Sequence, residues 1–280
     1  LGETPRHTPV YLSREVVESH GLILINSVEP HYFAGYTGGR KSLVPGVAGF
    51  ETIEANHRLA LDPAADTLEL DGNPVHEDLL EAVALLPSRP LLSLQLVLDR
   101  SQRICAAYAG DLPESFANAV QAANREFVVD LQQRFDVVVT AAAPPMDYDL
   151  YQSQKAIDNA KWALKDGGTL ILVSKCREGM GEETFAKQLS FSPDKRQVLR
   201  NLDKEYELGF HKAAKMADIM CRCDIWAVTA LDPAILKGMG MVPFRGLQEA
   251  VDELLRQKPK AEVLVLLDGS VTVPRVREDE

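Results

Sequence analysis

The chain has 280 residues, enough for one large domain or two ordinary ones, and its 46% hydrophobic and 25% charged residues are typical of a globular protein. A formal net charge of -11 excludes a general surface for nucleic acid or anionic membranes, so an anionic ligand must be held by a local group of cations. Four cysteines do not make a disulfide scaffold, and neither a membrane-spanning run nor a signal peptide is visible. These features predict a cytoplasmic protein without nucleic-acid or membrane partners.

The first 130 residues are predicted to form one α/β domain of short elements. A buried strand leads into a glycine-rich loop, and two later strands are expected to pair as a hairpin. The predicted elements, in chain order, are a helix over 13–20, a strand over 22–25, helices over 50–61 and 74–86, strands over 93–98 and 103–108, and a helix over 112–127.

A more regular alternation of strands and helices begins near residue 131, with Gly167-Gly168 as a turn. The predicted strands cover 135–140, 169–174, 225–230 and 262–267, and the predicted helices cover 151–164, 181–190, 195–206, 211–219 and 246–257. Such alternation implies a parallel sheet covered on both faces, with ligands beyond the carboxyl ends of the strands. The predicted fold is therefore α/β, with two domains over 1–130 and 131–280, each a mostly parallel sheet flanked by helices.

The segment from His31 to Gly49 carries the densest chemistry in the sequence. It contains five glycines together with Arg40 and Lys41, and it follows the predicted strand over 22–25. Glycine loses the most backbone freedom on folding, so this abundance indicates close approach to another group or a positive φ. Beside a strand end, two cations favour an anion such as phosphate as that group. The spacing is neither that of a P-loop nor that of G-x-G-x-x-G.

Three side chains in this region have both a structural and a functional interpretation. His31 is as consistent with an acid/base group as with a satisfied loop residue, because imidazole titrates near neutral pH. His57 lies on an apolar helix face, which favours a core histidine, although a metal ligand would project from the same place. Lys41 is either a solvated lysine or a nucleophile, since the neighbouring Arg40 favours its neutral amine.

Tyr151, Gln152 and Lys155 lie on one side of the first turn of a predicted helix, beyond a strand end. They are either a polar helix start or a cluster of donors for a carboxylate. The residues alone favour neither interpretation.

Four motifs occur in order along the chain. They are His31-x-x-x-Gly35-x-x-Gly38-Gly39-Arg40-Lys41 followed by Pro45-Gly46, then Thr52-Ile53-x-x-Asn56-His57, Asp149-Leu150-Tyr151-Gln152-x-x-Lys155-Ala156, and Leu208-Gly209-x-His211-Lys212-Ala213. Together they resemble the nickel-dependent lactate racemase family, and the resemblance extends from about Thr8 to the last predicted strand.

The resemblance implies a nickel pincer nucleotide, pyridinium-3-thioamide-5-thiocarboxylic acid mononucleotide, which holds nickel through carbon and two sulfurs. Lys41 stands at the position of the lysine that binds this cofactor as a thioamide, and His57 stands at the position of a nickel ligand. His31 matches one of two acid/base groups. The glycine-rich loop, with Gly38, Gly39 and Arg40, suits the phosphate of the cofactor.

The implied reaction is racemisation or epimerisation of a 2-hydroxy acid such as lactate. A proton leaves the substrate hydroxyl, a hydride passes from the α-carbon to the cofactor, and the keto acid then receives the hydride on its other face. Tyr151, Gln152 and Lys155 match residues that line the substrate pocket. The expected partners are this small-molecule substrate and the enzymes that synthesise the cofactor.

Two departures from the family pattern bear on these expectations. Family members have an earlier segment with the second acid/base histidine and a substrate-binding arginine. The chain is therefore expected to be N-terminally truncated, and one open alternative is that it is inactive by itself. A pocket tryptophan of the family has no counterpart near Lys212-Ala213-Ala214-Lys215, which predicts a different pocket. The remaining alternatives are a non-catalytic nucleotide- or metal-binding fragment and a nicotinamide-type oxidoreductase, for which no dinucleotide fingerprint is found.

Overall fold

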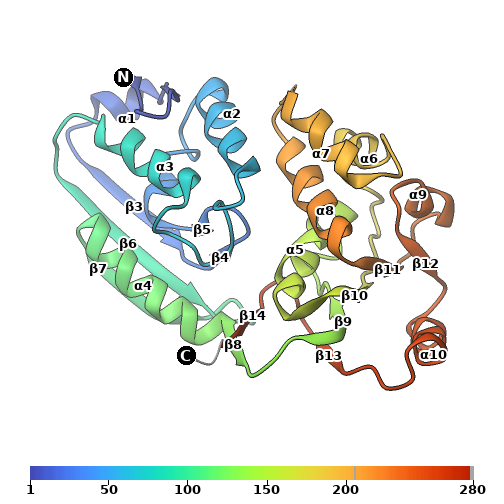
Figure 1. Ribbon diagram of the computed structural model, residues 1–280. Helices are drawn as coiled ribbons and strands as arrows, with labels where there is room; N and C mark the ends of the chain where they lie inside the picture. The colour runs from blue at the N-terminus through green and yellow to red at the C-terminus, as the bar shows by residue number, and fades with distance from the viewer. Residues whose placement is uncertain (205, 278–280) are drawn as a thin grey trace. The chain divides into compact units, whose positions relative to one another are not determined.

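The computed structural model describes residues 1–204 and 206–277, and the chain divides into two compact units, Leu1–Phe127 and Val128–Glu280 (Figure 1). The first unit is built on a three-stranded sheet in the order β3-β6-β7. Strand β3 (Leu22–Ser27) runs parallel to β6 (Leu91–Leu98), and β6 forms the expected antiparallel hairpin with β7 (Ile104–Gly110).

One face of this sheet is covered by α4 (Leu112–Phe127), which packs against β6 and β7. Because side chains alternate along a strand, Ser93 and Gln95 point to the covered face and are fully buried. On the opposite face Ile23 and Ile25 are 70% and 64% exposed. The site-bearing loop therefore belongs to the α4 side of the sheet, where Gln95 meets it.

The rest of the first unit consists of short elements around the glycine-rich loop. Its apolar core joins Phe33 and Val44 of that loop to Val75 and Leu79 of α3. The elements are β1 (Gly2–Glu3), β2 (Pro9–Val10), α1 (Arg14–Glu18), β4 (Pro30–His31), β5 (Gly35–Tyr36), the 3-10 helix η1 (Gly39–Ser42), α2 (Phe50–Arg58), the 3-10 helix η2 (Leu59–Leu61) and α3 (Pro74–Ala84).

The second unit is a five-stranded, fully parallel sheet in the order β12-β11-β10-β9-β13. Helix α10 covers one face, where Ala250 and Leu254 pack on alternate residues of the central strands. Helix α5 covers the other face, where Thr140 donates to the carbonyl of Ala156. The strands are β9 (Phe135–Ala141), β10 (Leu164–Val173), β11 (Asp224–Val228), β12 (Val242–Phe244) and β13 (Val263–Leu266), with a separate parallel pair of β8 (Val128–Leu131) and β14 (Val273–Val276).

The helices of this unit are α5 (Leu150–Ala160), the 3-10 helix η3 (Lys161–Ala163), α6 (Glu183–Leu189), α7 (Lys195–Lys204), α8 (Phe210–Arg222), α9 (Pro233–Gly238) and α10 (Leu247–Gln257). The predicted class, α/β with mostly parallel sheets flanked by helices, is confirmed. The predicted turn at Gly167-Gly168 is wrong in detail, because both glycines lie inside β10, where the pairing with β9 shifts register between Leu164 and Thr169. In the part of the chain that the structure describes, no helix is long and apolar enough to cross a membrane.

Candidate functional site

Three residues predicted from the sequence gather around one buried aromatic ring in the first unit. Phe33 is 3% exposed, and its ring centroid lies 4.6 Å from that of His31 and 5.1 Å from that of His57, both edge-on. The Nζ atom of Lys41 lies 5.6 Å from the same centroid. The first and last of these residues are 26 positions apart in the sequence (31 to 57). The fold therefore places two imidazoles and an amine around a single side chain.

The loop reaches this arrangement through close backbone packing. At Gly35, with φ of +72°, an added Cβ would lie 2.1 Å from the carbonyl oxygen of Glu69. At Gly38, with φ of +78°, it would lie 2.6 Å from Cγ2 of Val28 and 2.8 Å from Oε1 of Gln95. The amide of Gly39 donates to that same Oε1 at 2.9 Å. The close approach that the glycines indicated is thus made, at these positions, to the unit's own atoms.

Arg40 points into the unit and is only 1% exposed. Its Nη2 donates to the carbonyl of Ala34 at 2.7 Å, which ties the end of the loop to its beginning, and its guanidinium carbon lies 4.8 Å from the ring centroid of Phe116. Burial lowers the pKa of Arg40 to about 9, and Nε and Nη1 have no hydrogen-bond partner among the described residues. A buried cation in this state favours a nearby anion.

Lys41, the next residue, turns the other way, toward Phe33 and His57. The two side chains diverge because η1 is a 3-10 helix, in which successive residues are about 120° apart (three per turn). Lys41 is also the only lysine among residues 1–127. Any lysine-dependent chemistry of the first unit must therefore use this side chain.

His57 is held in its neutral form. Its pKa is lowered from 6.5 to about 4, first by burial and then by the charge of Lys41, while a hydrogen bond with the backbone of Ile53 acts in the opposite direction. A neutral imidazole with one ring nitrogen bound to a backbone carbonyl is the usual state of a metal-ligating histidine. The residues around His57 thus supply the form that can coordinate a metal ion.

Two neighbours in the same motif fix helix α2, from which His57 projects. Thr52 donates to the carbonyl of Pro9 at 2.7 Å, and the Nδ2 of Asn56 donates to Oδ2 of Asp78 at 2.8 Å. Thr52, Asn56 and Asp78 are completely buried. Spaced four residues apart, Thr52 and Asn56 share one side of the helix and leave His57 on the adjoining side.

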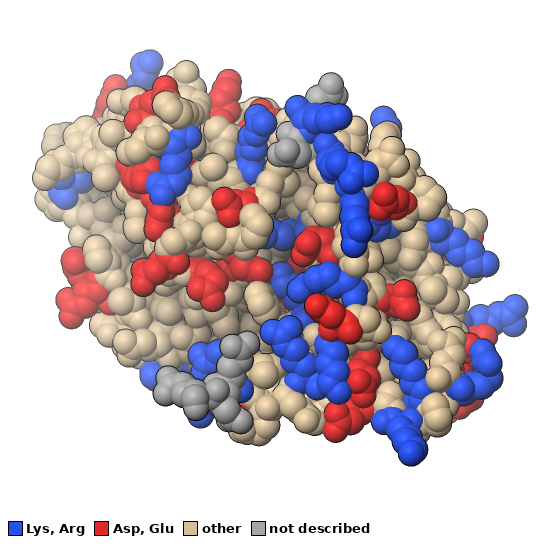
Figure 2. All heavy atoms as spheres, in the orientation of Figure 1, with Lys and Arg blue, Asp and Glu red and all other residues tan. Residues whose placement is uncertain are grey.

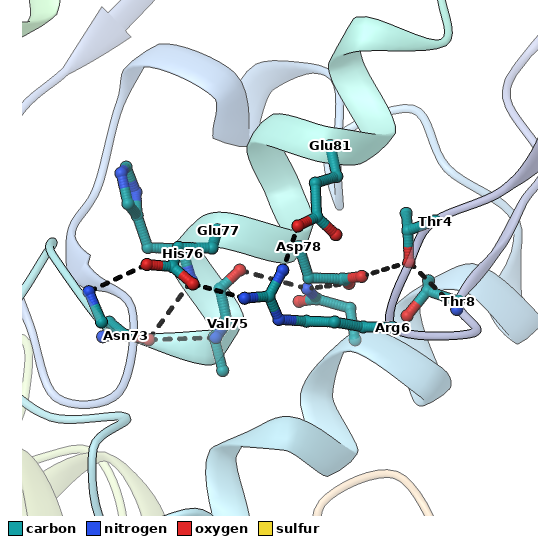
Figure 3. Close-up of polar contacts among 11 residues, drawn as sticks. Thr4, Arg6, Thr8, Asn73, Val75, His76, Glu77, Asp78 and Glu81 are labelled. Carbon is teal, nitrogen blue, oxygen red and sulfur yellow. Dashed lines mark hydrogen bonds and ion pairs between the residues drawn. The ribbon is translucent and has the colours of Figure 1, made fainter.

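Figure 3 shows the network that continues from Asp78. Thr4 donates to Oδ1 of Asp78 at 2.6 Å, and Arg6 forms ion pairs with Glu77 and Glu81, which lie about one turn apart on α3. Asn73 caps α3 by accepting from the amides at 75 and 76, and its Nδ2 donates to the carbonyl of Phe33 at 3.0 Å. The cap of α3 therefore also holds the backbone of Phe33, the residue around which the site is arranged.

Phe33, Asn73 and Asp78 were not predicted as site residues. Pro74 at the first helical position is a signal for the α3 cap, but the sequence carries no signal for the bond from that cap to Phe33. Among residues 1–204 and 206–277, no cluster of three or more His, Cys, Asp or Glu could hold a metal by itself.

In the second unit, Tyr151, Gln152 and Lys155 lie on the partly exposed side of α5, next to the carboxyl end of β9. The amides of Leu150 and Tyr151 donate to backbone carbonyls of the 174–182 loop, at 3.1 and 3.2 Å, and the amide of Gln152 donates to the capping Asp149 at 2.6 Å. The first backbone amides of α5 thus already have acceptors within the protein. Positive charge that could attract an anion here comes from side chains.

A second lysine lies behind Tyr151. Lys212 of α8 is 5% exposed, and its Nζ donates to the backbone carbonyl of Tyr151 at 2.6 Å while lying 3.7 Å from the centroid of the tyrosine ring. Burial, followed by the charge of Lys155, lowers the pKa of Lys212 to about 7. The sequence placed Lys212 in a family motif but assigned it no role.

The chain matches the lactate racemase N-terminal domain over residues 1–68 and the lactate racemase C-terminal domain over residues 130–273. It is 30% identical over 258 residues to the lactate racemase of Thermoanaerobacterium thermosaccharolyticum, covering 90% of this chain and 60% of that protein. It is 29% identical over 282 residues to the lactate racemase of Lactiplantibacillus plantarum, covering 96% of this chain and 65% of that protein.

Solved structures agree with these relatives. The lactate racemase apoprotein from Thermoanaerobacterium thermosaccharolyticum superposes with a TM-score of 0.92 at 29% identity, covering 99% of this chain and 67% of that one. A Thermotoga maritima protein, with a TM-score of 0.70 at 15% identity over 97% of this chain and 70% of that one, shows the shared fold alone. The chain thus spans 60% and 65% of the length of the two curated relatives, and it belongs to the lactate racemase family.

Proposed function

We propose that this chain takes part in racemising or epimerising a 2-hydroxy acid of the lactate type with a nickel pincer nucleotide. The observation that carries the proposal is the gathering of His31, Lys41 and His57 around Phe33. Together they would offer an amine for attachment of the cofactor, a neutral imidazole for the metal and a second imidazole for proton transfer. The relatives named lactate racemase support the reaction class.

The residues of the first unit fit such a cofactor. Lys41 would carry it, and His57 would supply a nickel ligand. Arg40 turns away from these two side chains toward Phe116, so its buried charge would favour the cofactor phosphate through its field and not through a direct contact. Gly38 and Gly39 would bring the loop close, and their own packing keeps the loop in one conformation. When bound, the cofactor supplies a carbon centre that accepts and returns a hydride.

His31 would move the proton of the substrate hydroxyl. The amide of Ala34 donates to Nδ1 of His31 at 3.4 Å, so the loop's own backbone orients the ring. As general base the neutral ring would accept the hydroxyl proton and become imidazolium, and the imidazolium would return that proton to the substrate oxygen in the reverse direction. The second unit would bind the substrate carboxylate through Lys155, with Tyr151 and Gln152 as neighbouring donors.

The test is the attachment of the cofactor. The chain is produced together with cofactor-synthesis enzymes, and its intact mass, its nickel content and the mass of the peptide that contains Lys41 are measured. We expect an adduct on that peptide, because Lys41 is the only lysine of residues 1–127, and its loss in Lys41→Ala.

Lys258→Ala serves as the control, since Lys258 is a lysine of the second unit and should leave the adduct unchanged. An adduct that survives in Lys41→Ala would refute the assignment of the attachment site. Interconversion of D- and L-lactate by the loaded protein then tests the reaction class itself.

A further inference from the structure

Helices α5 and α8 hold each other by reciprocal contacts at the carboxylate site of the second unit. The Nζ of Lys212 on α8 donates to the carbonyl of Tyr151 on α5, and the Nε2 of Gln154 on α5 donates to the carbonyl of Lys212 at 2.9 Å. Each helix thus sends a buried side chain to the main chain of the other. The Lys212 ammonium, under the tyrosine ring, fixes where that ring and its hydroxyl lie.

Charged groups of α5 and its cap act on Lys212. Lys155 disfavours the protonated form of Lys212, whereas Asp158 and Asp149 favour it, and burial outweighs them. Burial also raises the pKa of Tyr151, followed by the charges of Glu182 and Asp149, so the hydroxyl stays a hydrogen-bond donor at neutral pH. Two lysines and one phenol therefore share a small region in which one lysine changes its charge near neutral pH.

The other elements packed against α8 are α6, α7 and β10. On the face shown in Figure 2, Lys and Arg side chains gather over α7 and α8. The charged residues described on α6 and α7 are Glu183, Lys187, Lys195, Arg196, Arg200 and Lys204. Strand β10 carries Asp166 and Lys165, and the latter is paired with Asp136 and Glu262 at the far end of the strand.

We propose that Lys212 positions Tyr151 and acts as the second cation of the carboxylate site, so that a small 2-hydroxy or 2-keto acid binds to this unit together with a proton. Lys155 and Tyr151 would touch the carboxylate, and Lys212 would act from behind the tyrosine ring. Only the identity of the ligand rests on the proposed function. The physical basis is that two adjacent ammonium groups repel each other, and an anion beside them removes that repulsion.

Linkage makes the proposal measurable without the cofactor. If a carboxylate stabilises the protonated Lys212, protonation must strengthen carboxylate binding by the same factor. For each unit by which the ligand raises the pKa of Lys212, the ligand binds about tenfold more tightly at low pH than at high pH. Lactate should therefore bind several-fold more tightly at about pH 6 than at about pH 8. These two values lie on either side of the pKa of about 7 that Lys212 has without ligand.

The experiment follows lysine Cε signals of the full 280-residue chain, labelled with 13C-lysine, by NMR against pH, with and without L-lactate or D-lactate. The signal absent from Lys212→Met identifies Lys212. We expect its midpoint to rise when lactate is added. Lys212→Met should bind lactate more weakly and without the pH dependence, and Lys212→Arg, which stays charged, should bind with little pH dependence.

Lys195→Met is the matched control. Lys195 is 6% exposed and also donates to backbone carbonyls, those of Leu189 and Ser192 at 2.7 and 3.1 Å, but it belongs to α7. This variant should keep the pH dependence of lactate binding. Circular dichroism checks the fold of each variant, and Lys212→Arg carries the test if Lys212→Met does not fold.

Unchanged lactate affinity and pH dependence in Lys212→Met, or no lactate binding by the parent chain at any pH, would overturn the inference. These outcomes are distinct from failure of the proposed function, because binding is measured without cofactor. Binding that depends on Lys212 in a protein that, once loaded, racemises no 2-hydroxy acid would support the inference and refute the proposed function.

Discussion

The neutral state of His57 predicts a specific loss of stability in acid. Its pKa of about 4 in the folded chain lies below the ordinary 6.5 of an unfolded one. Between these two values the unfolded state binds the proton and the folded state does not, so the free energy of unfolding falls as pH falls from 6.5 to about 4. Above 6.5 the imidazole contributes no slope.

The size of the effect follows from the two pKa values. A difference of one pKa unit corresponds to about 1.4 kcal/mol, so the full interval is worth roughly 3 kcal/mol, and about 2 kcal/mol after allowing for the partial exposure of the ring. Replacement by glutamine, which keeps a polar side chain of similar length but takes up no proton, should remove this part of the slope. At about pH 4.5, His57→Gln should thus lose less stability relative to pH 7 than the parent chain, by about 2 kcal/mol.

Urea unfolding followed by two signals measures this difference. Trp162 and Trp226 are the only tryptophans of the chain and both lie in the second unit, so their fluorescence reports that unit, while far-UV circular dichroism reports both. The change should appear in the dichroism transition of the first unit and be absent from the fluorescence. Parallel loss of stability in the parent chain and in His57→Gln would show that the imidazole is already protonated in the folded state, and the metal-ligand argument would fall with it.

Two further predictions concern the frame of the first unit. Asp78→Ala removes a buried acceptor of two hydrogen bonds, from Thr4 and Asn56, and should lower the free energy of unfolding by about 3–5 kcal/mol, measured by urea denaturation. Asp78→Asn, which keeps one acceptor oxygen, should lose less, and equal losses would show that these hydrogen bonds are not the cause. Gly35→Ala meets both a positive φ and the Glu69 carbonyl, whereas Gly72→Ala has a similar φ of +75° and nothing within 4 Å. Gly72→Ala should lower the free energy of unfolding by ~1–2 kcal/mol, the cost of a left-handed backbone, and Gly35→Ala should lower it by well over that amount. Equal midpoints of thermal unfolding for the two variants would exclude the contact with Glu69 as the cause.

The parts that local sequence signals describe were predictable. Helix α5 begins within one residue of its expected start, and both ends of α4 fall where expected. The α3 helix begins at the expected proline for the same kind of reason. These features depend on neighbours within four residues, which a single sequence displays.

The parts that depend on tertiary contacts were not predictable. Arg40 and Lys41 read alike in the sequence, yet one faces Phe116 and the other Phe33. Lys212 comes to Tyr151 only because α8 packs on α5, 61 residues away along the chain. The glycines indicated a close approach without saying to what, and at Gly35 the partner is the backbone of Glu69.

Three cations near the candidate sites rest on aromatic rings. Arg40 lies over Phe116 at 4.8 Å, Lys41 over Phe33 at 5.6 Å and Lys212 over Tyr151 at 3.7 Å. Outside these sites Lys161 also lies over Trp162 and Arg177 over Tyr148, while Lys165 and Arg275 are paired with carboxylates.

The choice of partner decides whether a cation can still attract an anion. A carboxylate stabilises a cation by cancelling its field and would itself repel an anionic ligand, whereas the face of an aromatic ring stabilises the cation and carries no net charge. In a chain with a net charge of -11, cations held in the second way add to a local positive potential. The aromatic residues Phe33, Phe116 and Tyr151 therefore have an electrostatic part in both candidate sites, as well as a place in the packing.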